Sequence, residues 1–586
     1  MAGKMINLKI NGIDVQVEAG TTILEAARKV GIRIPTLCYL KDINAIGACR
    51  VCVVEVKGAR SLVASCVYPV SEGMEVTTNS PRVLNSRKKT VELLLSDHDK
   101  KCLSCVRSGN CELQTLANEF GCDDVKFKGE VNNFELDEST PYLVRDNNKC
   151  ILCRRCVAAC KQYQSVAVIG ANARGFKTNI GSEFSKPLME IACVGCGQCI
   201  NVCPTGALRE RDEIDEVFAA INDPSKVVIV GTAPSVRVGL GEEFGNPIGT
   251  NVEGKMVAAL KKLGFDWVFD VNVTADLTIL EEGTEFIGRV LNGGKLPMIT
   301  SCSPGWIKYI EHYYPDYLAH LSSCKSPQQM FGAVCKTYFA EKMGLDPKNI
   351  VVVSIMPCTA KKFEKTRPYQ DAAGKGIQDV DYALTSRELA RFIKRQGIMF
   401  NELKDEEFDA PMGIASGAGL IFGATGGVME AALRTVYEVL EKKELKNLDF
   451  EAVRGTEGIK EAVIPVHVNG KLVDVKVAAV SGLANAKIIM EKIKNGEADY
   501  HFIEVMACPG GCVNGGGQPI QPADVRNNVD IRKIRAAMLY ETDKSMALRK
   551  SHESPVVKEL YDTYFGEPGS EKSHHILHTK YVARGK

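Results

Sequence analysis

The sequence is poor in the features that mark exported, membrane-spanning or strongly charged proteins. No stretch reaches the run of about 18 apolar residues that a bilayer-spanning helix needs, so we expect no membrane segment. The N-terminus has neither an apolar signal core nor a twin arginine, which favours the cytoplasm and leaves export on a partner's signal as the alternative. A formal net charge of +1 excludes a general attraction to nucleic acid or to a membrane surface.

Cysteine, in contrast, is abundant, with 22 cysteines in 586 residues. A disulfide framework does not suit a chain of this length without a secretory leader. Most of the cysteines stand in the spacing of iron–sulfur ligands, so we predict a series of thiolate-bound iron clusters that conducts electrons. The length predicts several domains.

The first cysteine set follows a predicted hairpin over residues 6–20, with Asn11-Gly12 as its turn, and a helix that opens near Thr21-Thr22. The set has the form C-x10-C-x2-C plus a distant fourth cysteine. Its members are Cys38, Cys49, Cys52 and Cys66. This order resembles a 2Fe–2S ferredoxin domain of the variant found at the N-terminus of respiratory complex I and hydrogenases. The alternative is four buried structural cysteines.

The second set combines one histidine with three cysteines in the pattern H-x3-C-x2-C-x5-C. Its members are His98, Cys102, Cys105 and Cys111. A zinc site with three cysteines and one histidine is the alternative that the spacing permits. The position between two iron–sulfur modules favours a His-ligated 4Fe–4S cluster instead.

The third set is a duplicated C-x2-C-x2-C-x3-C motif, the pattern of two-cluster ferredoxins, in which the fourth cysteine of each run ligates the other cluster. One 4Fe–4S cluster is therefore predicted on Cys150, Cys153, Cys156 and Cys203. The other is predicted on Cys193, Cys196, Cys199 and Cys160.

Two features remain outside these sets. Cys122 is interpreted as a packed or free thiol. The basic stretch 82–89, RVLNSRKK, is interpreted as a solvated helix face, with guidance of an acidic electron-transfer protein as the alternative.

From about residue 213 apolar runs alternate with helical patterns, which predicts an α/β domain. Four runs end in loops of unusual composition: one at Thr232 to Ser235, and three at the cysteines 302, 358 and 508/512. Because functional groups of open α/β sheets gather at the carboxyl ends of strands, we expect one site at one sheet edge. The glycines at 510, 511 and 515–517 are expected to let the backbone approach a cofactor closely.

These loops carry a specific resemblance. The segments TSCSPGW (300–306), MPCTAKK (356–362) and EVMACPGGCVNGGGQP (504–519) resemble the three signature segments of the iron-only (FeFe) hydrogenases. Members of that family carry the H-cluster, a 4Fe–4S cluster bridged by a cysteine sulfur to a diiron unit with CO, cyanide and a dithiolate amine. The resemblance covers essentially the whole chain, and the tail resembles the family's small subunit fused to the large one.

The resemblance implies a role for each matching residue around the H-cluster. The 4Fe–4S ligands would be Cys358, Cys508, Cys512 and Ser303, with Cys512 bridging to the diiron unit. Lys361 would pair with one cyanide, for which a compact ammonium donor is apt. The residues Ala233, Pro234 and Ser235 would contact the other cyanide, and Met356 and Met506 would line the pocket. For the two methionines, ordinary core packing is the alternative.

The resemblance also implies a proton route. In order outward its members would be Cys302, Glu282, Ser322, Glu285 and Arg289. The three charged residues are spaced i, i+3 and i+7, which places them on one helix face. Without the resemblance, a solvated face would be the simpler interpretation.

The chain departs from the family at one position, where a serine, Ser303, replaces the second of two adjacent cysteines. Serine is a harder and less acidic donor than the expected thiolate. Three interpretations follow: the serine ligates an iron, one of Cys302, Cys324 and Cys335 substitutes for it, or the change damages activity. We favour serine ligation or a near-normal site.

The predicted fold is multidomain, α/β and α+β. The expected domains are a 2Fe–2S ferredoxin-like domain (1–82), a His-ligated 4Fe–4S domain (83–130), a two-[4Fe–4S] ferredoxin-like domain (131–212), an H-cluster domain (213–527) and a helical small-subunit-like segment (528–586). No G-x-G-x-x-G nucleotide motif and no flavin module is recognisable. Electrons are therefore expected from a ferredoxin or a flavoprotein partner, with H2 and protons as substrates and maturation proteins supplying the diiron unit.

The resemblance implies a reversible reduction of protons to H2 by a ferredoxin hydrogenase. The principal alternative is the catalytic subunit of a multisubunit NAD(P)-linked hydrogenase, including an electron-bifurcating one. A hydrogen sensor and an electron-transfer subunit of the complex I type are the alternatives from other classes.

Overall fold

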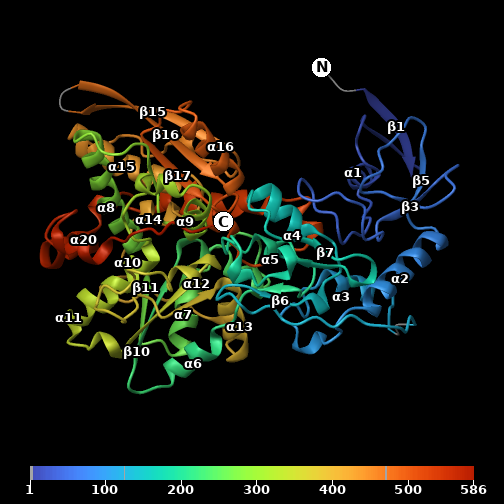
Figure 1. Cartoon of the computed structure of the whole chain (residues 1–586), viewed down its shortest axis with the longest axis horizontal. Helices are drawn as coiled ribbons and strands as arrows, with labels where there is room; N and C mark the ends of the chain where they lie inside the picture. The colour runs from blue at the N-terminus through green and yellow to red at the C-terminus, as the bar shows by residue number, and fades with distance from the viewer. Residues whose placement is uncertain (1–3, 124–125, 469–470, 586) are drawn as a thin grey trace.

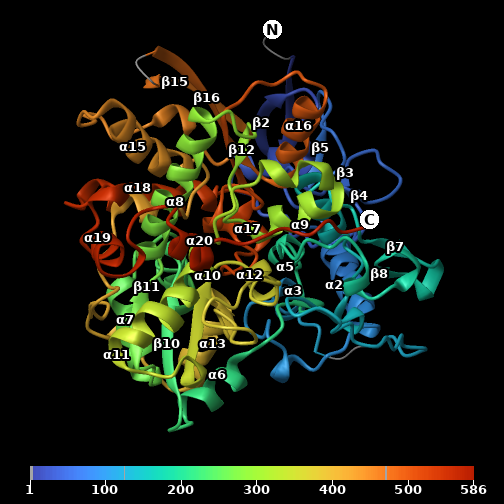
Figure 2. The ribbon, with the colours of Figure 1, turned by 60° about the vertical axis from the view of Figure 1, so that its left-hand side comes forward.

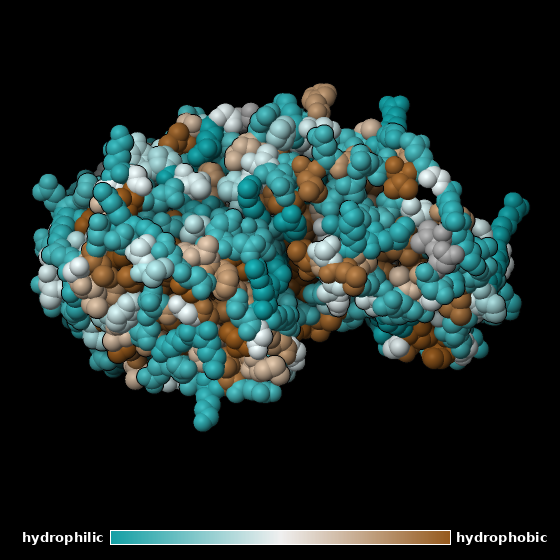
Figure 3. All heavy atoms as spheres, turned by 90° about the horizontal axis from the view of Figure 1, so that it is seen from below, coloured by the Kyte–Doolittle hydropathy of each residue, from teal (hydrophilic) through white to brown (hydrophobic). Residues whose placement is uncertain are grey.

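The structure is a computed structural model, and it describes residues 4–123, 126–468 and 471–585. Figure 1 shows the N-terminal modules at one end of the elongated molecule and the large α/β domain at the other. Viewed from below, a hollow separates the two ends, and the visible face is mainly hydrophilic with scattered hydrophobic groups (Figure 3). Among the described helices, none has the length and apolar character to cross a membrane.

The N-terminal domain is built on a five-stranded sheet in the order β2-β1-β5-β3-β4. Its strands are β1 (Met5–Ile10), β2 (Ile13–Glu18), β3 (Val53–Val56), β4 (Val63–Ala64) and β5 (Glu75–Thr77). Asn11 and Gly12 join β1 to β2 with φ of 49° and 83°, as a type I′ turn requires. The Thr22 hydroxyl accepts from Glu25 N and caps α1 (Ile23–Lys29). The predicted hairpin and helix are thus confirmed.

A helical connection leads from this domain to the ferredoxin-like region. It contains α2 (Pro81–Ser96) and α3 (Glu112–Glu119), followed by the short helices α4 (Arg155–Ala158) and α5 (Gln198–Asn201). The basic stretch lies on α2, but it is not wholly a solvated face. Arg87 is buried and donates to the carbonyl of Val53 at 2.8 Å, so one of its cations fixes α2 to the first sheet.

The large domain contains two four-stranded sheets, whereas the sequence analysis expected one site at the edge of one sheet. The first has the parallel order β11-β10-β13-β14, and the second has the order β12-β17-β16-β15. Their members are β11 (Trp267–Asp270), β10 (Val227–Thr232), β13 (Ile350–Met356), β14 (Tyr382–Thr385), β12 (Met298–Ile299), β17 (Phe502–Met506), β16 (Lys471–Ser481) and β15 (Ile459–Val468). The four functional loops divide between the sheets, two following β10 and β13 and two following β12 and β17. The carboxyl ends of both sheets therefore supply the site together.

Helices cover these sheets and carry much of the polar chemistry. The central ones are α8 (Asn272–Leu291), α9 (Pro304–Tyr313), α10 (Pro327–Val334), α14 (Gly417–Ile421) and α15 (Gly427–Glu441). Because strands of the first sheet are covered on both faces, β10 is almost wholly buried along its length.

The C-terminal segment is helical, as expected, and wraps the large domain. It contains α18 (Ile531–Ser545), α19 (Pro555–Leu560) and α20 (Glu571–Leu577), and α20 lies beside α10 (Figure 2). Asp543 on α18 pairs with Arg434 on α15 at 2.9 Å, and both side chains are fully buried. Removing one partner of such a pair leaves an uncompensated buried charge, so this contact fixes the segment firmly to the domain.

Candidate functional site

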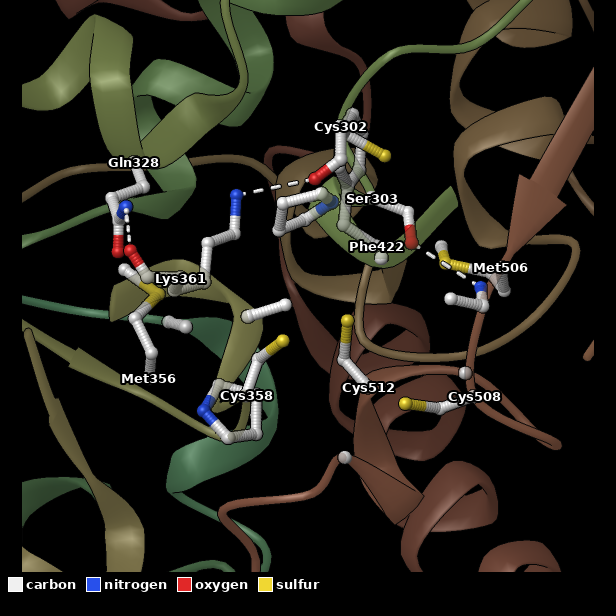
Figure 4. A pocket seen from close by; sticks show the side chains of 18 of the residues that line it. Cys302, Ser303, Gln328, Met356, Cys358, Lys361, Phe422, Met506, Cys508 and Cys512 are labelled. Atoms are coloured by element: carbon white, nitrogen blue, oxygen red, sulfur yellow. Dashed lines mark hydrogen bonds between the residues drawn. The ribbon is translucent and has the colours of Figure 1, made fainter. Parts of the chain in front are cut away.

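Residues that follow strands of both sheets line one buried cavity. Its lining includes Ala233 and Pro234 after β10, Met356 and Cys358 after β13, Cys302 and Ser303 after β12, and Met506, Cys508 and Cys512 after β17. In Figure 4 the thiols of Cys358, Cys508 and Cys512 point into a common space, with the Ser303 hydroxyl above them. The structure thus brings together all the residues that the resemblance placed around the cubane.

The chemistry of these thiols fits metal binding. Burial raises the pKa of Cys358, and it raises the pKa of Cys512 to about 12. Three neutral thiols crowded into a dry cavity have little to gain there except as ligands of a metal that replaces their protons. Ser303 Oγ accepts a hydrogen bond from Ala507 N at 3.2 Å, which holds its oxygen at the cavity wall.

The polar groups on the opposite wall fit an anionic ligand. Lys361 Nζ donates to the Cys302 carbonyl (3.1 Å), to Ser326 Oγ (2.8 Å) and to Glu364 Oε2 (2.8 Å). Ser235 lies beside Ala233 and Pro234; its side chain does not line the cavity, yet Oγ is buried and has no hydrogen-bond partner in the described part of the chain. A buried hydroxyl without a partner and a buried ammonium group are both donors that suit a ligand that accepts hydrogen bonds.

Ser326 and Glu364 were missed by the sequence reasoning. Glu364 stands three residues after Lys361 on α12 (Ala360–Glu364), and this spacing was the signal that could have indicated their ion pair. Nothing in the sequence connected Ser326 to this lysine. Met356 and Met506 line the cavity and are also packed in the two main hydrophobic cores, so both interpretations of them hold.

The glycines after β17 allow close packing of the loops, and Gly511 and Gly515 also line the large cavity, where their approach to a cofactor stays a prediction. A Cβ at Gly515 would lie 2.1 Å from the carbonyl oxygen of Pro357, and a Cβ at Gly516 would lie 2.3 Å from that of Cys196. These glycines therefore let the cysteine-bearing loops pack backbone against backbone. Gly510 and Gly511 have φ of 89° and 93°, a conformation that glycine adopts without strain.

The five residues of the predicted proton route lie in sequence from the cavity outward. Glu282 on α8 is only 2% exposed, so it is not part of a solvated face. Burial raises its pKa to about 8, against the lowering effect of the Ser322 hydroxyl. Ser322 Oγ donates to Glu285 Oε2 at 3.2 Å, and Arg289 donates to Glu285 Oε1 at 2.6 Å. Cys302 lies at the inner end, near enough for the Glu282 charge to affect its thiol.

Two further cavities lie in the ferredoxin-like region, and each is lined by four cysteines. One is lined by Cys150, Cys153, Cys156 and Cys203. The other is lined by Cys160, Cys193, Cys196 and Cys199. The fourth cysteine of each run has therefore crossed to the other set, in the grouping that the spacing predicted. Cys196 also lines the large cavity, so the two cavities share a wall.

The first N-terminal set is equally close-packed. Its four cysteines are buried, and the Cys49 and Cys66 thiols hydrogen-bond to the Cys38 sulfur and hold its pKa low. Mutual contact of four sulfurs is the arrangement that a 2Fe–2S cluster needs.

The second set is more open. Burial lowers the pKa of His98, and its Nδ1 is buried without a partner among the described residues, so a neutral ring nitrogen is available for a metal. Its three cysteines, at 102, 105 and 111, are half-buried. A Cβ at Gly206 would lie 2.6 Å from Cys105 Sγ, which places this loop directly against the ferredoxin-like region.

The unassigned cysteines lie apart from these sites. Cys122 packs with its Sγ 3.9 Å from the Lys88 carbonyl, as a structural thiol would. Cys324 and Cys335 are fully buried in the first core and do not line the large cavity. Neither is placed to replace the serine at 303.

The fold and its five groups of metal-ligand residues, one of them in a large buried reaction cavity, define an iron–sulfur oxidoreductase. Matches to known sequence families agree along the chain. They are a 2Fe–2S iron–sulfur cluster binding domain (3–81), the iron–sulfur binding region of NADH-ubiquinone oxidoreductase G (87–126), a 4Fe–4S dicluster domain (149–207), the C-terminal domain of the iron-only hydrogenase large subunit (226–516) and the iron hydrogenase small subunit (529–584).

Two relatives match almost the whole chain, and one solved structure matches part of it. The NADP-reducing hydrogenase subunit HndD of Solidesulfovibrio fructosivorans is 49% identical, over 99% of both chains. Iron hydrogenase 1 of Clostridium pasteurianum is 46% identical, over 98% of this chain and 100% of its own. A solved apo variant of the [FeFe]-hydrogenase HydA1 from Chlamydomonas reinhardtii is 43% identical with a TM-score of 0.57, over 64% of this chain and 100% of its own. This protein belongs to the FeFe hydrogenases.

Proposed function

We propose that this FeFe hydrogenase interconverts protons and H2 at the large cavity, and that four N-terminal clusters carry the electrons between that cavity and a ferredoxin. The observation that supports this most is the convergence of three cysteines, Ser303 and Lys361 from two sheets on one buried cavity that shares Cys196 with its neighbour. When bound, the H-cluster supplies the metal centre at which protons and electrons combine.

The residues around the cavity then have distinct tasks. Cys358, Cys508, Cys512 and Ser303 would hold the cubane, Lys361 would donate to one cyanide, and Ala233, Pro234 and Ser235 would contact the other. The mostly apolar wall, including Met356 and Met506, excludes water. Protons move between the cavity and solvent through Cys302, Glu282, Ser322, Glu285 and Arg289.

The cluster ligands form the electron path. We assign the 2Fe–2S cluster to the set that begins at Cys38, the His-ligated cluster to the set that begins at His98, and the two remaining 4Fe–4S clusters to the crossed sets. We propose that domain 1–82 holds the 2Fe–2S cluster, 83–130 the His-ligated cluster, 131–212 the two other 4Fe–4S clusters and 213–527 the H-cluster, while 528–586 is the small-subunit-like segment. Because thiols that serve as cluster ligands must stay reduced, a reducing compartment such as the cytoplasm suits this chain.

A second candidate is an NAD(P)-linked complex in which a flavoprotein subunit replaces ferredoxin as electron partner. The similarity to a subunit named as NADP-reducing over 99% of the chain favours it. The two candidates differ in whether the isolated chain can evolve hydrogen with electrons from ferredoxin.

The test is hydrogen evolution by the chain after maturation, with reduced ferredoxin and, separately, with NADPH as donor. We expect turnover with ferredoxin and none with NADPH alone. No turnover with ferredoxin, but turnover with reduced methyl viologen, would support the obligate complex. No turnover with reduced ferredoxin or with reduced methyl viologen, in protein that shows the infrared bands of bound CO and cyanide, would contradict the proposal.

Replacing His98 by cysteine should make the potential of the second cluster more negative by roughly 100 mV or more, because a fourth thiolate adds negative charge that favours the oxidised state. Redox-poised EPR of the chain expressed without maturation proteins measures this shift. Cys122→Ser, in the same region, is the matched control and should leave all cluster signals in place. An unchanged potential would exclude His98 as a ligand.

A further inference from the structure

The C-terminal segment places a histidine against the outer part of the proton route. His578 follows α20, and backbone hydrogen bonds hold it on both sides: Lys325 N donates to the Leu577 carbonyl and Thr579 N to the Ser323 carbonyl, each at 2.8 Å. The ring is buried, with 8% of the residue exposed. The pairing thus fixes the imidazole beside α8.

A continuous chain of hydrogen bonds joins Glu285 to this ring. Ser323 Oγ donates to Glu285 Oε2 at 3.0 Å, and the same oxygen lies 2.8 Å from His578 Nδ1. A hydroxyl can accept one proton while it gives up another, so Ser323 can relay a proton between the carboxyl and the imidazole. This branch starts at the same carboxylate oxygen that accepts from Ser322.

The far side of the ring faces a second carboxylate. His578 Nε2 lies 3.0 Å from Glu281 Oε2, and the Glu281 side chain is fully buried. Glu281 Oε1 accepts from the Tyr561 hydroxyl at 2.6 Å, and Oε2 accepts from Gly569 N at 3.0 Å. Glu281 therefore fixes the orientation of the ring and keeps Nδ1 turned toward Ser323.

A purely structural lock is the simpler interpretation of this cluster, since Glu281 already ties three parts of the segment to α8. A purely structural role would be served by the contact of Nε2 with Glu281 alone. It does not require Nδ1 to contact Ser323, which in turn bonds to Glu285 of the proton route. The ring also stacks on exposed His574, with centroids 4.3 Å apart, at the edge of the protein. The branch from Glu285 therefore ends at a ring that lies one side chain from the surface.

We propose that His578 is a second proton-exchange group of this hydrogenase, on a branch that leaves the main route at Glu285. In the outward direction the Glu285 proton passes to Ser323 Oγ, the Ser323 hydroxyl proton passes to His578 Nδ1, and the ring releases a proton to water; inward transfer reverses each step. No electrons move, and one proton is displaced at each bond. The inference rests on the proposed function, because it extends the same proton route.

The test is chemical rescue of His578→Ala. Because Arg289 leaves the main route open, we expect hydrogen evolution to fall by about three- to tenfold rather than to be lost, which is below the range for a sole proton-transfer group. Small imidazoles and pyridines that enter the vacated space should restore the rate, and the rescue should vary systematically with the pKa of the added base. His578→Gln, which fills the space without titrating, should show the same loss, and exposed His575→Ala should leave the rate unchanged.

A second readout needs no turnover. In the chain labelled with 15N-histidine and produced without the diiron unit, Ser323→Ala should shift the His578 Nδ1 resonance, because it removes that nitrogen's partner. Wild-type rates in both His578 variants would overturn the inference, as would rescue that is independent of base pKa, a loss that no base restores, or an unmoved resonance. Failure of the proposed function would appear differently, as a wild-type chain that carries CO and cyanide bands but evolves no hydrogen.

Discussion

Glu282→Gln should lower hydrogen evolution by the matured chain by about 10²- to 10⁴-fold, the usual contribution of a positioned proton-transfer group. Glutamine keeps the size of the side chain but cannot pass a proton between Cys302 and Ser322. The site is well suited to test this because Glu282 is fully enclosed and burial raises its pKa to about 8. Glu282 bonds to the Ser322 hydroxyl, and its charge also acts on the Cys302 thiol, so it is the carboxyl placed to join these two groups.

The raised pKa of Glu282 also predicts the direction in which hydrogen evolution should change with pH. A carboxyl with a pKa of about 8 is mostly protonated at neutral pH and ionises as the pH rises further. Glu282 can therefore donate protons inward below a pH of about 8, and hydrogen evolution should fall on the alkaline side of that value. The Glu282→Gln variant should lack this alkaline limb.

Three results control the interpretation. The infrared bands of CO and cyanide should be the same in wild type and variant, which shows that the metal centre has assembled. Glu282→Asp, which keeps a titrating group at a shifted position, should retain more activity than Glu282→Gln. An active glutamine variant with a wild-type pH profile would remove Glu282 from the route.

The sequence predicted the local parts of this molecule well because their determinants are local. Ligand spacing encodes the geometry of a cluster loop directly, so the crossing of Cys160 and Cys203 between the two ferredoxin-like cavities could be read from two short motifs. The turn at Asn11-Gly12 and the cap at Thr22 depend on backbone conformations that a few residues specify.

The parts that could not be predicted depend on long-range packing. Whether β12 and β17 share a sheet with β10 and β13 is set by strand order, and β12 itself has only two residues, too few for a periodic signal. The close packing of the glycines after β17 against Pro357 and Cys196 could not be predicted, because those two residues belong to distant segments. His578 and Ser323 are likewise 255 positions apart, and only the fold brings them together.

Ser303→Cys should make the cubane in the large cavity at least about tenfold slower to lose iron to a chelator. Loss of even an outer partner of a metal ligand costs about 10- to 100-fold in affinity, so exchange of a direct thiolate for a hydroxyl should cost no less. The position favours ligation, since Ser303 lines the cavity with Cys358, Cys508 and Cys512, while neither Cys324 nor Cys335 does. Cys302 also lines the cavity and stays the alternative ligand. Iron release is best followed by Mössbauer spectroscopy in protein made without maturation proteins, where Cys122→Ser is the matched control.

Hydrogen evolution from reduced methyl viologen then decides what the serine does to catalysis. If Ser303 is an iron ligand, the matured wild type should be active and the cysteine variant should differ from it by less than about tenfold, because both side chains complete the cubane and leave the proton route intact. Equal iron release in both proteins would mean that position 303 is not a ligand at all. Activity confined to the cysteine variant would mean that the hydroxyl disables the site, and the natural chain would then bind or sense hydrogen rather than turn it over.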